Sequence, residues 1–480
     1  MPPHPPFPIN ARSYQAYEEE LKSGKIPLEW IPVVKDIPLV TPGQPATMLR
    51  VSGTKFVGFE QNMTNQPYPP DVQVAAGNND VMEMVNLEGG IWTKGGAPVK
   101  QFPLDMFFSL SPTHLISDPR VIYDQQSGRW FAEIMDQTSS TISIAVSQTG
   151  DPAGTWSTYM IQYSDPCIDF PKIGTSNDKF VVSTNDFTSG CQTFTASEMV
   201  VLDKDQLVGH GTYVGSSDLT DPNFSVTPAR SLSPTSPLFM VANNPSVIGN
   251  TLTVYKLEGP AEYVQVSTNF TGTSTMQADA PFIPQNGTSV LVSTPPHGFE
   301  DAAWSQGKIW SAFTDACRPA EGFAKRVYSC VHVFGYNTTT GNSIDFEVTN
   351  SDYNFSYPAV SVDGHGAMYL TFNGVSSRSY PSIYATVQTR YDLPNSVEPM
   401  VEVAQGSNYD TSCRYGDYFG AASDPADPDM VWIAGEYHRL SGEFLLQNPC
   451  GGSISSPAWS TLVASLTAWN STQHQGGLLP

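Results

Sequence analysis

Short apolar runs separated by polar turns recur along the whole chain. The clearest stretch has runs at residues 121–123, 130–135, 142–146 and 156–161, with Gly, Asp, Ser and Thr between them. Period-two alternation between such turns is typical of antiparallel strands. The pattern therefore predicts a four-stranded antiparallel sheet over residues 121–161.

The first run of each unit opens near an Asp or a Pro, and this marker recurs. It stands at Asp71, Asp118 and Asp169, with weaker copies at 226–229, 301–304, 357–362 and 417–422. Diverged all-strand units of about 45 to 60 residues are the signature of a propeller. We therefore expect an all-β fold, a seven-bladed β-propeller over residues 46–467, with an insertion at about 271–300.

The last unit shows three clear strands and lacks a fourth. Residues 48–59 alternate as a strand does, and we expect this N-terminal strand to close the last blade, which would remove the exposed edges of the ring. Residues 1–45 form a Pro-rich arm with a short helical stretch at 13–23, and residues 468–480 form a C-terminal tail.

Charge and composition restrict the functional class. The formal net charge of −23 argues against nucleic acid and anionic membranes as partners, since both are polyanions. No run of 18 apolar residues occurs, and no cleavable signal peptide is visible, so we interpret the chain as a mature form. These features favour an acidic, soluble, secreted protein, and we expect a monomer.

The cysteines and sequons also indicate an extracellular protein. The six cysteines fall as sequence neighbours, which predicts the disulfide bonds Cys167–Cys191, Cys317–Cys330 and Cys413–Cys450. Sequons that would make the chain a glycoprotein occur at Asn62, Asn223, Asn269, Asn286, Asn337, Asn354 and Asn470.

Four motifs carry a resemblance to a known family. They are the stretches at 118–131, 145–156, 169–174 and 414–418. Together they resemble secreted, largely uncharacterised seven-bladed propellers, over residues 65–467. The stretch from Ser147 to Trp156 is also similar to the Asp-box of sialidase-like propellers, a structural turn that buries its Trp. The resemblance implies a fold and a compartment, and no catalytic residue.

Acidic residues mark the start of several inner strands, and equivalent positions in a ring converge on its axis. The five are Asp71, Asp118, Asp169, Asp301 and Asp417. Gathered at one channel mouth, they would repel one another unless protonated, hydrated or neutralised by a cation. Oxygen ligands at flexible spacing suit Ca²⁺, which makes calcium the expected cofactor. Two alternatives stay open: the carboxylates cap turns, or they are catalytic.

Aromatic and ionisable residues near this rim extend the hypothesis. Tyr415, Tyr418, Trp304 and Tyr357 are candidates for stacking on sugar rings, against the alternative that they pack between blades. Glu436, His438 and His297 are the candidates for proton transfer, with the histidines expected in or near loops.

Two functions remain compatible with the sequence. The first is an extracellular propeller that binds or processes a glycan or polysaccharide at one axial, cation-assisted acidic site, as a glycoside hydrolase or polysaccharide lyase if it is an enzyme. The second is a non-catalytic structural or protein-interaction propeller with a structural calcium ion. The blades diverge in sequence, which favours one axial site over a site in every blade.

Overall fold

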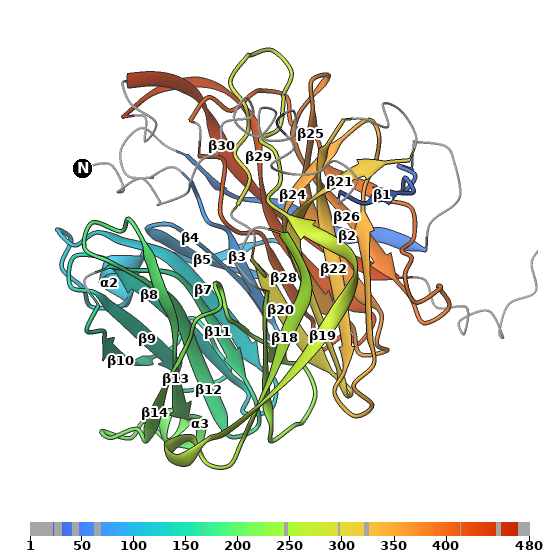
Figure 1. Ribbon diagram of the computed structural model, residues 1–480. Helices are drawn as coiled ribbons and strands as arrows, with labels where there is room; N and C mark the ends of the chain where they lie inside the picture. Colours follow the sequence, from blue (N-terminus) through green and yellow to red (C-terminus); the bar gives the residue numbers. More distant parts are fainter. Residues whose placement is uncertain are drawn as a thin grey trace, which may run out of the picture.

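The chain forms an all-β propeller (Figure 1). The structure is a computed structural model that describes residues 23, 31–40, 48–61, 69–165, 167–243, 248–295, 298–320, 326–412, 414–447 and 453–468. The helices bounded within these residues are the short α2 (Leu104–Phe107), α3 (Lys204–Val208) and the 3-10 turn η2 (Ala261–Tyr263). None of the described helices has the length and hydropathy to cross a membrane.

Five separate sheets of four strands make up most of the ring. The first sheet consists of β3 (Gln73–Ala76), β4 (Asp80–Val85), β5 (Glu88–Thr93) and β6 (Pro98–Pro103), and the second of β7 (Ile116–Asp124), β8 (Arg129–Asp136), β9 (Thr141–Ser147) and β10 (Trp156–Gln162). The third consists of β15 (Thr227–Pro228), β17 (Leu238–Asn243), β18 (Ile248–Glu258) and β19 (Gln265–Ala278), and the fourth of β24 (Asn354–Val362), β25 (Met368–Ser376), β26 (Ser379–Gln388) and β27 (Val401–Ala404). The fifth consists of β28 (Gly420–Ser423), β29 (Met430–Gln447), β30 (Ser453–Ala468) and the N-terminal β2 (Leu49–Glu60).

The remaining strands form one ten-stranded sheet. It consists of β11 (Cys167–Thr175), β12 (Lys179–Phe187), β13 (Phe194–Asp203), β14 (Ser216–Asp221), β20 (Asp301–Ser305), β21 (Lys308–Pro319), β22 (Tyr328–Asn337), β23 (Ser343–Val348), the connecting β16 (Arg230–Ser231), and β1 (Val33–Val34) beside β21. The prediction of seven separate blades is therefore corrected to five. The physical reason is β16, whose backbone pairs in parallel with both β11 and β20 and so fuses two four-stranded runs.

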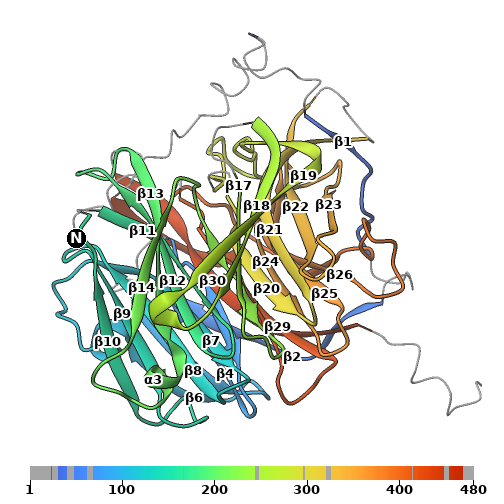
Figure 2. The same cartoon turned by 60° about the horizontal axis from the view of Figure 1, so that its bottom comes forward.

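The first strands of the sheets contact one another in a closed circle. β3 contacts β7, and the circle continues through β11, β15, β20, β24 and β28, which contacts β3 again. Figure 2 shows the sheets following one another in chain order around this circle. Residues at the start of these strands are thereby brought from distant parts of the sequence to one axis.

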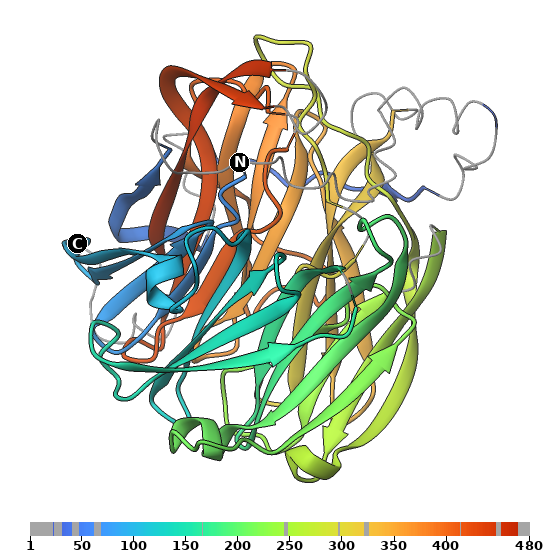
Figure 3. The same cartoon turned by 90° about the vertical axis from the view of Figure 1, so that its left-hand side faces the viewer.

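The ring closes through the N-terminal strand. β2 pairs antiparallel with β30, with Leu49 opposite Ala468 and Phe56 opposite Val463. In Figure 3 the blue β2 segment accordingly lies beside the red strands of the same sheet. The prediction that residues 48–59 complete the last unit is confirmed, and this pairing covers an edge of β30.

Two of the expected disulfide bonds are confirmed. Cys167 is bonded to Cys191, and Cys317 to Cys330. The third expected pair, Cys413 and Cys450, lies outside the described residues. A bond of this kind stabilises the fold by about 2–4 kcal/mol, mainly because it restricts the unfolded chain.

The segment 271–300 is only partly an insertion. Its first residues, to Ala278, extend β19 along β18, so the expected boundary is wrong by these eight residues (271–278). Beyond β19 the segment bridges on itself between Ile283 and Val292 and contacts the loop near Asp410 through the Gln285 side chain. It therefore packs on the ring instead of projecting from it.

The hydrophobic core lies between neighbouring sheets, and one such layer joins the first and last sheets. Phe59 of β2, which is 4% exposed, belongs to it and packs edge-on against Trp92 of β5, with ring centroids 5.4 Å apart. The closing strand is thus held by side-chain packing as well as by its backbone ladder.

We expect Phe59→Ala to lower the free energy of unfolding by about 3–5 kcal/mol, because it opens a cavity where the ring closes. Denaturant titration of the full chain measures this loss. Phe270→Ala is the matched control: Phe270 is 73% exposed on β19, and its removal should change stability by less than about 0.5 kcal/mol. Equal losses in the two variants would contradict the assignment of β2 as a packed closing strand.

Candidate functional site

The inner strands share a backbone distortion near their starts. Five non-glycine residues there adopt a left-handed conformation: Asp71 (φ 51°), Asp118 (φ 56°), Phe170 (φ 57°), Ser225 (φ 57°) and Tyr357 (φ 55°). In β7, β11 and β24 a shift of the strand register spans this point. These are β-bulges, which re-aim side chains out of the regular alternation of a strand. They explain why the marker recurs in the sequence.

Side chains from the preceding part of the ring bind the backbone at three of these bulges. The hydrogen bonds run from the backbone N–H of Asp118 to Asn86 Oδ1 (2.8 Å), of Ser225 to Asn185 Oδ1 (2.9 Å) and of Tyr357 to Thr314 Oγ1 (3.0 Å). A left-handed non-glycine residue costs about 1–3 kcal/mol unless its surroundings hold it in place. Here the adjacent sheet provides that support, so the bulges also link the sheets.

Four of the five predicted acidic residues gather at one end of the axis. Asp71 accepts hydrogen bonds from the Asn86 amide (2.5 Å) and from the backbone N–H of Asp417 (3.0 Å). Asp118 accepts one from the Tyr418 hydroxyl at 3.0 Å. Asp169 and Asp417 interact electrostatically with Asp118 and with each other. All four are at most 6% exposed, and we call them the axial acid cluster.

The fifth residue, Asp301, does not join the cluster. Its carboxylate binds the Arg230 guanidinium with both oxygens and accepts the backbone N–H of Val360 at 3.0 Å. It lies along the same axis, in a narrow polar cavity that Arg120, Lys172 and Glu300 also line. The expectation that all five carboxylates gather at one mouth is therefore corrected for Asp301, because this carboxylate pairs with Arg230 instead.

Arginines of the chain itself neutralise part of the axial acid cluster. Arg414, whose side chain is 15% exposed, donates to Asp417 and also attracts Asp71 and Asp169. The Arg120 guanidinium lies 3.5 Å from the Tyr418 ring centroid and donates to the backbone carbonyl of Pro171 at 2.8 Å. Calcium at this site stays a prediction.

Burial dominates the electrostatics of the cluster. Burial, with Asp417 and Asp118 adding to it, raises the pKa of Asp71 well above its usual value. Burial likewise raises the pKa of Asp169, with Asp118 adding to it. For Asp417, burial outweighs the opposing attraction of Arg414 and raises the pKa to about 8. Burial thus favours the protonated form of Asp71, Asp169 and Asp417.

The aromatic residues expected on the rim are buried. Tyr415 is fully buried, Tyr357 1%, Tyr418 2% and Trp304 7% exposed. Their polar ends bind the protein: the Tyr415 hydroxyl donates to the Glu436 backbone carbonyl at 2.8 Å, and the Tyr357 hydroxyl to that of Ser293 at 2.9 Å. Packing between sheets, the alternative given for these rings, describes their positions.

The candidates for proton transfer also lie inside the protein. Glu436 and His438 stand in β29 and contact each other, with Oε1 and Nε2 3.0 Å apart. Burial raises the pKa of Glu436 and lowers the pKa of His438. The expectation that His438 lies in a loop is wrong, since it pairs with Trp459 in the β-ladder. His297 lies outside the described residues.

Several buried charges at the axis were not identified from the sequence. Lys172 follows a bulge, donates to Ser225 Oγ at 2.7 Å, and has a pKa lowered by burial. Glu300 accepts from the backbone N–H and the hydroxyl of Thr314, at 2.9 and 2.7 Å, and burial raises its pKa to about 8. Glu133 is buried beside Arg120. A charged residue at an inner-strand position would have been the clue for Lys172.

The similarity to known proteins is in fold alone. No family model matches the chain, and neither does any curated protein. Similar solved structures include an ulvan lyase of a new polysaccharide lyase family, 8% identical over 68% of this chain and 80% of that chain, with a TM-score of 0.38. A neuraminidase-like protein of a flat-faced bat isolate from Peru is 8% identical over 94% of this chain and 98% of that chain, with a TM-score of 0.37. The WD40 domain of Pan2 from Neurospora crassa is 10% identical over 84% of this chain and 89% of that chain, with a TM-score of 0.37. At these values the likeness carries no argument about activity.

The cluster combines groups that can donate and accept protons. Four buried carboxyls stand close together, with a guanidinium in contact with Asp417 and a phenol in contact with Asp118. Pairs of carboxyl groups whose surroundings separate their pKa values can act as general acid and base. The same groups also hold the first and last sheets together.

We expect Arg414→Gln to lower the free energy of unfolding by about 1–3 kcal/mol, because it removes the guanidinium that donates to Asp417 and attracts Asp71 and Asp169. Chemical denaturation at pH 7 tests this. The control is Arg439→Gln, which removes the half-exposed ion pair with Glu60 and should cost at most about 1 kcal/mol. A small loss for Arg414→Gln would show that the cluster is neutralised in another way.

The stability of this protein should fall as the pH rises from 5 to 8. A carboxyl with a raised folded pKa binds more protons in the folded than in the unfolded state, so the free energy of unfolding falls as pH rises between the two pKa values. For Asp417, Glu300 and Glu83 this window runs from about 4 in the unfolded chain to about 8. The melting temperature should therefore be higher at pH 5 than at pH 8.

Glu83→Gln provides the control for this experiment. Burial raises the pKa of Glu83, against the weaker opposing effect of the Thr461 hydroxyl. The variant should reduce the pH slope of the unfolding free energy by about one proton. A melting temperature that rises from pH 5 to pH 8 would refute the description of the cluster.

Proposed function

We propose that this protein is an extracellular propeller that acts on a glycan at the axial acid cluster. The observation that carries the proposal is the buried Asp417 carboxyl in contact with Arg414 and beside three other buried carboxyls, with a pKa that burial raises to about 8. We count the fused sheet as two blades in this proposal, so that the site lies on the axis of a seven-membered ring.

Glycoside cleavage uses one protonated and one ionised carboxyl group on either side of the scissile bond. Asp417 supports the role of general acid, because burial raises its pKa to about 8. Asp118 supports the role of base, because the Tyr418 hydroxyl donates a hydrogen bond to it. The net charge of −23 favours an uncharged glycan over a polyanionic one.

A second function rests on the burial of the same groups. The cluster is at most 6% exposed, and Asp71 spans from the first to the last inner strand through its bond to the Asp417 N–H. This favours a structural role for the cluster in a non-catalytic binding propeller. In that case the carboxylates would bind a structural Ca²⁺ ion, as the sequence predicts. The two functions differ in whether a glycan is altered or bound at the axis.

The extracellular location is part of the proposal. Its support is the two disulfide bonds, which persist in oxidising compartments. Among the sequons, Asn269 is exposed and is the acceptor we propose for glycosylation. Asn354 is 6% exposed within β24, and its side chain accepts the Ser329 N–H, so the folded protein does not present it.

A glycan panel tests the proposed activity. The full chain is incubated with neutral and acidic polysaccharides from pH 4 to pH 8, while reducing ends and unsaturated uronates are measured as products. We expect product from at least one polysaccharide and a loss of about 10²–10⁴-fold in rate for Asp417→Asn, which removes the proton but keeps the shape.

Asp301→Asn is the matched control, since it alters an axial carboxylate that pairs with Arg230 outside the cluster. Its rate should stay near that of the unaltered chain. If no polysaccharide gives product, or if Asp417→Asn leaves the rate unchanged, catalysis at the cluster is refuted. Binding of a glycan without product, with a chelator-sensitive melting temperature, would instead establish the non-catalytic function with calcium.

A further inference from the structure

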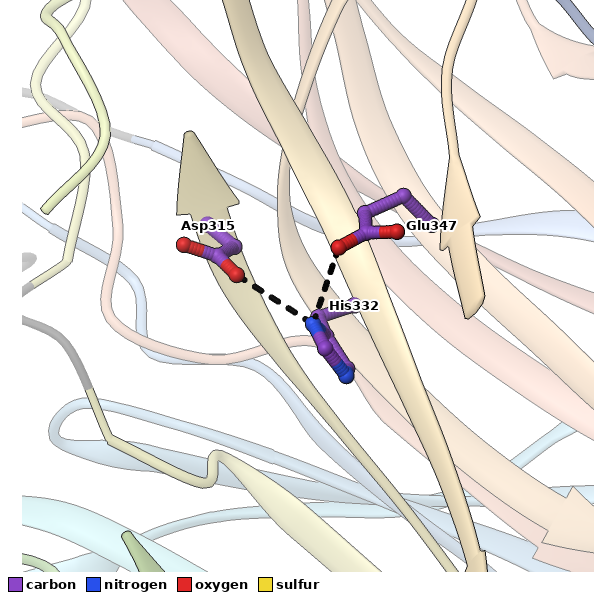
Figure 4. Close-up of side chains that lie close together, drawn as sticks. All are labelled: Asp315, His332 and Glu347. Atoms are coloured by element: carbon purple, nitrogen blue, oxygen red, sulfur yellow. Dashed lines mark hydrogen bonds and ion pairs between the residues drawn. The ribbon is translucent and has the colours of Figure 1, made fainter. Parts of the chain in front are cut away.

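A second polar cluster lies away from the axis, on three neighbouring strands. Asp315 is in β21, His332 in β22 and Glu347 in β23. His332 stands directly opposite Glu347 in the β-ladder, and Asp315 lies diagonally across from His332. Figure 4 shows the two carboxylates pointing at the imidazole from the adjacent strands. All three residues are buried.

One imidazole nitrogen faces two carboxylate oxygens at once, each at the long end of the hydrogen-bond range. His332 Nδ1 lies 3.2 Å from Asp315 Oδ2 and 3.2 Å from Glu347 Oε1. A charge-assisted hydrogen bond is about 2.7–2.9 Å, and a single N–H cannot point at two oxygens. Ligand atoms about 2.1 Å from a shared metal ion stand about 3.0–3.4 Å apart. The observed distances match the edges of such a coordination shell.

The surroundings orient the ligands independently of one another. The backbone N–H groups of Ala278 and Ala316 donate to Asp315 Oδ1, at 2.7 and 2.8 Å, and leave Oδ2 facing His332. The imidazole is stacked on Phe313, with centroids 4.7 Å apart. Metal sites characteristically have such outer contacts, which fix the ligand geometry.

The other imidazole nitrogen gives a separate observation. His332 Nε2 is buried and makes no hydrogen bond with the described residues, although Asp345 Oδ2 is 3.4 Å away. A buried histidine normally uses both ring nitrogens. The site thus has a polar atom that is not satisfied by direct hydrogen bonding, beside a third carboxylate.

A surface groove adjoins one side of the cluster. A groove of about 1490 Å³ separates residues 33–38 of the N-terminal arm from β23 and the segments at 350–352 and 395–397. Asp345 and Glu347 form part of its wall.

We propose that Asp315 Oδ2, His332 Nδ1 and Glu347 Oε1 bind a divalent transition-metal ion, Zn²⁺ or Mn²⁺. One imidazole and two carboxylates suit these ions, whereas Ca²⁺ takes oxygen ligands throughout. Three protein ligands would leave at least one coordination position for water or a further ligand. The proposal is independent of the function proposed for the axis.

Metal titration of the full chain tests this site. Protein stripped with chelator is titrated calorimetrically with ZnCl₂ and, separately, with MnCl₂, and metal content is measured after buffer exchange. We expect one equivalent of at least one of the ions to be retained. Glu347→Gln and Asp315→Asn, each close in shape to the native residue, should weaken its affinity by at least about 10–100-fold.

Glu198→Gln is the matched control. Glu198 belongs to a separate acidic group with Asp165 and Asp186. The variant should therefore bind the ion as tightly as the unaltered chain does. Circular dichroism in chelator checks that each variant is folded, and a visible Co²⁺ spectrum that is lost in a folded ligand variant reports directly on coordination. The proposal is overturned if the unaltered chain retains no ion, if both ligand variants bind as tightly as it does, or if the loss follows Glu198→Gln instead.

Discussion

The ring depends on hydrogen bonds that cross between sheets at the left-handed bulges of the inner strands. Such a conformation is unfavourable for residues like Asp118 and Tyr357, and it persists because Asn86 and Thr314 bind the backbone there. The contacts are local in space but join segments 32 and 43 residues apart. Folding of each sheet therefore prepares the binding groups for the next one, and the same distortion turns polar side chains toward the axis.

The carboxylates at that axis would repel one another if all were ionised. The cationic side chains of the protein and bound protons reduce this repulsion. Arg414 approaches Asp417 and Asp71, while burial keeps part of the cluster protonated. Buried charges remain stable only when paired or neutralised. The stability of the closed ring and the proton-donating chemistry proposed for the axis thus arise from one set of groups.

Much of this arrangement could be predicted from the sequence, for a physical reason. The alternation of apolar and polar residues gives strands, and equivalent positions in a ring meet at its axis, so Asp71, Asp118, Asp169 and Asp417 were identified as neighbours. Asp301 was misplaced because its ion pair with Arg230 depends on a contact between segments 71 residues apart. Burial of the aromatic residues, the fusion through β16 and the meeting of Asp315, His332 and Glu347 depend on strand register, which no local pattern encodes.

The central claim is that the axial acid cluster is neutralised from within, by Arg414 and by bound protons. An atomic-resolution crystal structure at neutral pH, with anomalous scattering data collected from crystals soaked in a heavy divalent cation, tests it most directly. We expect the Arg414 guanidinium in contact with Asp417, unequal C–O bond lengths in at least one carboxyl of the cluster, and no anomalous peak among the four residues. A cation bound between Asp71, Asp118, Asp169 and Asp417, with Arg414 turned away, would contradict the claim.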